Sequence, residues 1–125
     1  MIGRAFAVLL YAVIPAAAGE EDHLIPAGPG VISVSQLHTF CSSPNGSEGQ
    51  TACAAYLMGV VHGLQIGTKD TKRGEPFCIP ASITAPQAIQ MFNDAVAKNP
   101  DLAPGVGAAF WAAVLGVKFA CPKSN

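Results

Sequence analysis

Apolar positions recur at helical spacing along the run CAAYLMGVVHGLQIG, which spans residues 53–67. The apolar row consists of Ala54, Leu57, Met58, Val61 and Leu64. A second row holds only small residues at every fourth position, namely Ala55, Gly59, Gly63 and Gly67. Because each glycine inside a helix costs about 1 kcal/mol relative to alanine, we expect a neighbouring backbone to pack against this row. The pattern predicts a central core helix, and a groove that receives a partner's chain is the alternative.

A short helix precedes this run. Either Ser33 or Ser35 can serve as its N-cap, and the turn-forming sequence Pro44-Asn45-Gly46 limits it at the other end. Its apolar positions are Leu37, Phe40 and Cys41. This pattern predicts a short helix with one apolar face.

A third helix is expected to begin at Thr84. Thr84 and Gln87 have the spacing of a capping box, and Pro86 is tolerated in a first helical turn. The pair Asn99-Pro100 ends the helix. The predicted buried positions are Ile89, Phe92 and Val96.

The stretch 106–117 carries no charged residue, and its apolar side chains cannot all face one way on a helix. Such a helix is buried on more than one side. Either it is the innermost helix of the domain, or it supplies a surface for self-association. We favour the second interpretation, with Trp111 and Leu115 as the interface of a homodimer.

Length and composition fit one small domain. The chain has 125 residues, of which 50% are hydrophobic and 12% charged, so it can form a core. We therefore predict an all-α fold, a small disulfide-stapled bundle of about four helices in an up-down arrangement. The net charge of -1 and the lack of a basic cluster argue against nucleic acid and anionic membranes as partners.

The N-terminus resembles a secretory signal peptide. Arg4 precedes ten apolar residues, 5–14, which is too short to span a bilayer, and cleavage after Ala18 satisfies the small-residue rule. We predict a signal peptide over 1–18, a single domain over 19–125 with a flexible leader at 19–32, and a periplasmic location. A retained membrane anchor is the alternative.

All four cysteines lie beyond the expected cleavage point and would reach an oxidising compartment. They are Cys41, Cys53, Cys78 and Cys121, and their spacing matches no common zinc finger. We expect two disulfides rather than a zinc site. In an up-down bundle, Cys41 and Cys53 meet at one pole and the other two cysteines at the opposite pole, although the other two connectivities stay open.

The segment 68–76 is the most highly charged part of the chain beyond the signal peptide and is predicted to be an exposed loop. Its charged residues are Lys69, Asp70, Lys72, Arg73 and Glu75. A disulfide at Cys78 would tether one end of the loop and reduce the entropy it loses on binding. We therefore assign partner binding to these five residues, with a merely solvated connection as the alternative.

Few residues could support catalysis. His23 lies in the leader, His38 in the first helix and His62 in the central helix, and none belongs to a Ser, His and Asp motif. No glycine-rich phosphate loop is present either. We predict no catalytic residue, no cofactor and no bound metal, which leaves recognition as the function.

The order of short motifs C…CxxYLxGV…FCIP…TxxQ…NP…FxCP resembles the Rap/Tai-type immunity family. These motifs occur here at Cys41, 53–60, 77–80, 84–87, 99–100 and 119–122. The resemblance implies a small, helical, disulfide-bonded periplasmic protein that neutralises a peptidoglycan amidase toxin delivered by type VI secretion. It also implies inhibition by stoichiometric binding, often as a homodimer, with a protruding loop that occludes the active-site cleft of the toxin.

Two hypotheses follow. The first is a periplasmic immunity protein whose partner is a peptidoglycan amidase effector. The second is an exported helical chaperone or structural binding module without a toxin partner, which would use the apolar surface of 106–117. An enzyme comes third, with His62 as the residue to test.

Overall fold

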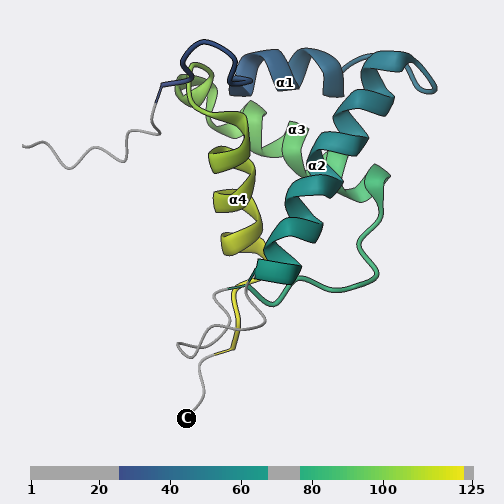
Figure 1. The fold of residues 1–125 in the computed structure, drawn as a ribbon, viewed down its shortest axis with the longest axis vertical. Coiled ribbons are helices and arrows are strands. Elements are labelled where there is room, and N and C mark those ends of the chain that lie inside the picture. The colour runs from purple at the N-terminus through teal and green to yellow at the C-terminus, as the bar shows by residue number, and fades with distance from the viewer. Residues whose placement is uncertain (1–25, 68–76, 123–125) are drawn as a thin grey trace, which may run out of the picture.

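The computed structural model describes residues 26–67 and 77–122. Within these ranges the chain forms four α-helices and one short 3-10 helix (Figure 1). Their bounds are α1 Val34–Cys41, α2 Glu48–Gly67, α3 Ala85–Lys98, η1 Pro100–Leu102 and α4 Gly107–Lys118. The predicted all-α fold of about four helices with two disulfides is confirmed.

The sequence led us to expect an up-down bundle, but the helices are arranged differently. Figure 1 shows α1 lying across one end of the molecule, while α2 and α4 both run away from that end and α3 crosses behind them. Helix α1 contacts each of the other three helices. It buries Val34, Leu37 and Cys41 in the core, whereas Phe40, which we expected on the same face, is 41% exposed. Helix α1 has eight residues and thus covers one end of the core with one apolar face.

Both predicted helix caps are present. At the start of α1, the Ser33 hydroxyl accepts a hydrogen bond from the Gln36 backbone N–H, and the Gln36 side chain accepts one from the Ser33 N–H. Thr84 and Gln87 make the same reciprocal pair at the start of α3. Each box satisfies two backbone donors that the first turn of a helix would otherwise leave without partners.

Trp111 is the centre of the core. Its side chain is fully buried, and its ring lies edge-on to Phe92 of α3, with the ring centroids 6.1 Å apart. Its Nε1–H donates a hydrogen bond of 3.0 Å to the Leu57 carbonyl of α2. Phe92 packs edge-to-face with Phe110 in turn, at 5.7 Å. One aromatic side chain therefore joins α4 to both α2 and α3.

We predicted a flexible leader over 19–32. This prediction is wrong for residues 26–32, because backbone hydrogen bonds tie them to the segment before α4 and to the start of α4. Residues 19–25 lie outside the described ranges. Ala27 N–H donates to the Pro104 carbonyl at 3.1 Å, and Gly107 N–H donates to the Ile32 carbonyl at 2.9 Å. Pro26 and Ser33 form isolated bridges to Gly105 and Val106. Proline and glycine here prevent regular structure without preventing order.

The small-residue row of α2 does not pack as predicted. A Cβ at Gly59 or Gly63 would meet no atom of the described chain within 4 Å, apart from the backbone of its own helix. Close approaches occur instead at two glycines of α4. A Cβ at Gly107 would lie 3.2 Å from the Ile32 carbonyl oxygen, and one at Gly116 would lie 2.7 Å from Cε1 of Phe77.

These contrasts predict opposite effects of the same substitution. Gly63→Ala should raise the free energy of unfolding by up to about 1 kcal/mol, because alanine favours the helix and the space is open. Gly116→Ala should lower it by about 1–3 kcal/mol, because the Phe77 ring must move. Urea unfolding followed by circular dichroism measures both changes. Destabilisation by Gly63→Ala would show that the row is packed after all.

Candidate functional site

The predicted contact loop, with Lys69, Asp70, Lys72, Arg73 and Glu75, lies outside the described residues, whereas the chain on both sides of it is described. Helix α2 ends at Gly67, and the Gln65 side-chain amide donates a hydrogen bond of 3.3 Å to the Pro80 carbonyl. The last turn of α2 is thereby joined to the segment that follows the loop.

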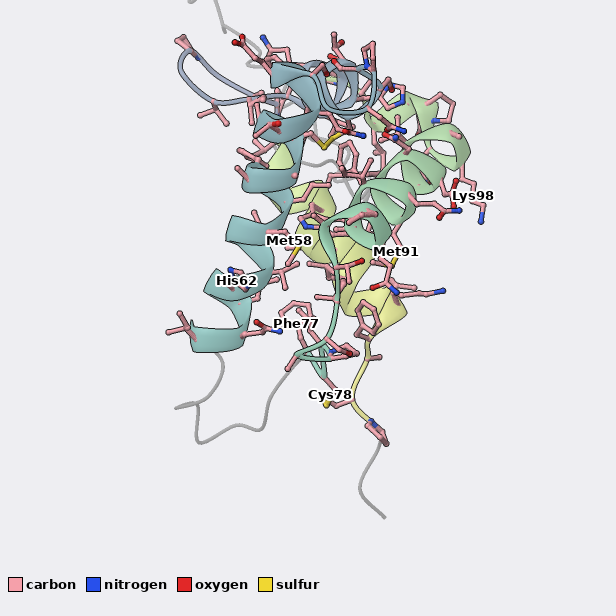
Figure 2. All side chains as sticks on the ribbon, turned by 90° about the vertical axis from the view of Figure 1, so that its right-hand side faces the viewer. Met58, His62, Phe77, Cys78, Met91 and Lys98 are labelled. Carbon is pink, nitrogen blue, oxygen red and sulfur yellow. A yellow bond between two sulfur atoms is a disulfide. The ribbon has the colours of Figure 1, made fainter. Side chains whose placement is uncertain are left out.

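The segment after the loop is fixed to the end of α4. Phe77 forms an isolated antiparallel bridge with Ala120, and Cys78 N–H donates a 2.8 Å hydrogen bond to the Phe119 carbonyl. Figure 2 shows Phe77 and Cys78 at the end of the molecule where α2 and α4 finish. The Phe77 ring lies against Gly116, where only a glycine leaves room for it. The loop thus leaves and re-enters a rigid framework.

Both disulfides form as the helix layout predicted. Cys41 pairs with Cys53, and Cys78 pairs with Cys121. Cys41 of α1 and Cys53 of α2 are buried in the core, whereas Cys78 is exposed and Cys121 half-buried. The first bridge belongs to the core, and the second holds the segment that follows the charged loop.

The assignment of Trp111 and Leu115 to a dimer interface is wrong. Each has 0% of its surface exposed within one protomer. Phe92 and the Leu57 carbonyl already occupy the surroundings of Trp111. A helix that is apolar all round was correctly read as buried on several sides, but the chain's own helices cover those sides.

The described titratable groups do not assemble a reactive centre. His62 is exposed on α2 (Figure 2), and His38 Nε2 lies 3.1 Å from the Ser42 hydroxyl; His23 falls outside the described ranges. Burial raises the pKa of the Tyr56 hydroxyl, and a hydrogen bond with the Ala108 backbone opposes part of that shift. Within 26–67 and 77–122, no group of three or more His, Cys, Asp or Glu side chains could hold a metal ion.

A groove of about 920 Å³ separates α3 from the connection between α1 and α2. Helix α3 contributes two rows of side chains with a spacing of four residues, namely Ala85, Ile89 and Asn93, and Pro86, Gln90 and Asp94. Ser42, Ser43, Asn45, Gln50 and Thr51 line the opposite wall. We name this feature the α3 groove. Apolar and polar side chains both line it, and Asp94 is its one charged lining residue.

Asn93 lines the α3 groove and carries a polar atom that is buried without a partner. Its Nδ2 donates a hydrogen bond of 3.2 Å to the Cys41 carbonyl. Because a carbonyl can only accept, this bond fixes the orientation of the amide and points Oδ1 elsewhere. Oδ1 is buried and receives no hydrogen bond from the described chain. A buried acceptor without a donor costs about 1–3 kcal/mol, so this position has an unmet requirement.

The sequence analysis missed the α3 groove, although one signal was present. Asn93 follows Ile89 by four residues, so a polar side chain lies on a row that was expected to be apolar. The opposite wall comes from the first turns of α2 and from the turn 42–47, which composition marked only as a connection. No local pattern could show that this turn faces α3.

No helix in the described ranges is long and apolar enough to cross a membrane. A comparison with protein families matches residues 33–121 to the model described as Rap1a immunity proteins. Neither the curated proteins nor the solved structures gave a match. The matched segment begins at the N-cap of α1 and ends at the second disulfide, so it includes all four helices. The chain therefore belongs to the Rap1a immunity family, and its role is that of an immunity protein against type VI secretion toxins.

Proposed function

We propose that the toxin is a peptidoglycan amidase and that this protein inhibits it by stoichiometric occlusion of the active-site cleft. The family match over 33–121 carries the immunity role, and the motif order C…CxxYLxGV…FCIP supports the amidase as its target. The protein acts by binding and not by catalysis.

The segment 68–76 is the contact element of this proposal. Five of its nine residues are charged, and its flanks are held by the bond between Gln65 and Pro80 and by the Cys78–Cys121 bridge. A segment whose two ends are fixed loses less conformational entropy on binding than a free one. Charged side chains in this segment would give specificity and a fast association rate.

Reversing two charges in this segment tests the assignment. The double variant Lys72→Glu, Arg73→Glu should weaken binding to the amidase at least about tenfold, because like charges would meet across the interface. Isothermal titration calorimetry gives the dissociation constant and the stoichiometry, for which we expect one amidase per protomer.

Lys98→Glu is the control for the single variants Lys72→Glu and Arg73→Glu. Lys98 is exposed on α3, and Figure 2 shows it well apart from Phe77 and Cys78. Each of the three variants carries the same change in net charge, and Lys98→Glu should bind like the unaltered protein. Equal weakening by all three would reduce the effect to net charge and remove 68–76 from the interface.

We also propose that the chain is exported to the periplasm after cleavage of the signal peptide at 1–18. Proteins of this family are typically periplasmic, and Ala16 and Ala18 provide the small residues that a signal peptidase requires. N-terminal sequencing of protein from an osmotic-shock fraction should begin at Gly19. Protein that stays in the spheroplasts and begins at Met1 would contradict export.

A homodimer is proposed on a different surface from the one predicted. Burial of Phe110, Trp111 and Leu115 removes most of the apolar surface of 106–117, on which the chaperone hypothesis also depended. Ile66 and Val117, near the ends of α2 and α4, are 74% and 85% exposed and remain available.

Sedimentation equilibrium should give the mass of two chains for the unaltered protein. The variant Ile66→Lys, Val117→Lys should sediment as one chain, because two lysines would have to be buried in the contact. A monomeric unaltered protein would contradict the dimer, and a dimeric variant would contradict this surface.

A further inference from the structure

We propose that the α3 groove is a second contact site, which binds an arginine side chain of the toxin. The Asp94 carboxylate is the counter-ion, and Asn93 Oδ1 is an additional acceptor. The identity of the partner rests on the proposed function, whereas the chemistry of the site rests on residues of this chain alone.

Charge favours a cation in the groove. Asp94 is the one acidic residue that lines the groove, and no basic residue lines it. Lys118 lies near it, across a second hollow of about 440 Å³ that both residues line, yet no ion pair involving Asp94 forms within the described ranges. The carboxylate is exposed on α3. It is therefore accessible to a positively charged group of a partner.

Hydrogen-bonding capacity favours a group rich in donors. The Asn93 Nδ2 group donates a hydrogen bond to the Cys41 carbonyl, and Asn93 Oδ1 accepts none from the described chain. A guanidinium group presents five N–H donors in a planar fork and no acceptor, so it can serve Asp94 and another oxygen together. The ammonium group of lysine is a compact point charge without this fork. The site therefore suits arginine better than lysine.

Access to Asn93 Oδ1 requires a local rearrangement. The atom has less than 1 Å² of accessible surface, so a side chain at the rim has to change rotamer before a donor can reach it. Gln90 is an exposed rim residue on the neighbouring row of α3. Rotamer changes of this kind are common when protein interfaces form.

The site can be tested with a model peptide. We would titrate acetyl-Gly-Gly-Arg-Gly-Gly-amide into the isotopically labelled full-length mature protein and record amide NMR spectra. The Asn93 side-chain amide and the Ser43 and Thr51 backbone signals should shift in a saturable way. The same peptide with citrulline, a neutral isostere of arginine, should leave them unchanged. Equal shifts with both peptides, or arginine-dependent shifts only outside the groove, would overturn the proposal.

A charge-neutralising variant provides the second test. Asp94→Asn should weaken binding of the arginine peptide about fivefold, as expected for an exposed ion pair. Asp101→Asn is the matched control, because Asp101 is exposed on η1 and does not line the groove. Equal affinities of the unaltered protein and the Asp94→Asn variant for the arginine peptide would show that Asp94 is not the counter-ion. That result would contradict the proposed site.

These experiments distinguish a failure of the groove proposal from a failure of the proposed function. An amidase that binds the unaltered protein and Asp94→Asn equally well would contradict the groove and leave the proposed function intact. Binding of the arginine peptide without binding of any amidase would support the groove chemistry and contradict the proposed partner.

Discussion

The hydrogen bond from Trp111 Nε1 to the Leu57 carbonyl is the contact on which the arrangement of the helices depends. It places the largest side chain of the core between α2 and α4, and the same ring packs against Phe92 of α3. A buried tryptophan needs a partner for its N–H, so the hydrogen bond fixes the orientation of the indole ring while packing fixes its position. Helix α1 then covers the end of this cluster with Val34 and Leu37.

The two disulfides act on different parts of this framework. The Cys41–Cys53 bridge is buried and ties α1 to α2 across a separation of 12 residues. The Cys78–Cys121 bridge spans 43 residues and holds the chain where it returns from the charged loop. Loop-entropy arguments give them about 3 and about 4 kcal/mol respectively, a large share of the stability of a domain of this size.

Local chemistry was readable from the sequence, and relations between distant segments were not. Thr84 and Gln87 defined the start of α3 because a capping box is a contact between neighbours in the chain. Trp111 lies on a helix that is apolar all round, and such a pattern cannot tell whether the chain itself or a second copy covers it. Gly59 and Gly63 show the same problem in reverse, since their small size suggested packing but their surroundings are open. The α3 groove depended on the orientation of α1 across the end of the core, which no periodicity specifies.

Hydrogen exchange of the protein with and without the amidase tests the central claim most directly. Our account predicts that binding slows exchange in 68–76 and in the segment that follows it, while exchange in α4 around Trp111 is unchanged. Protection that is confined to the exposed face of α2, with no change in 68–76, would contradict the view that this framework exists to present the charged loop.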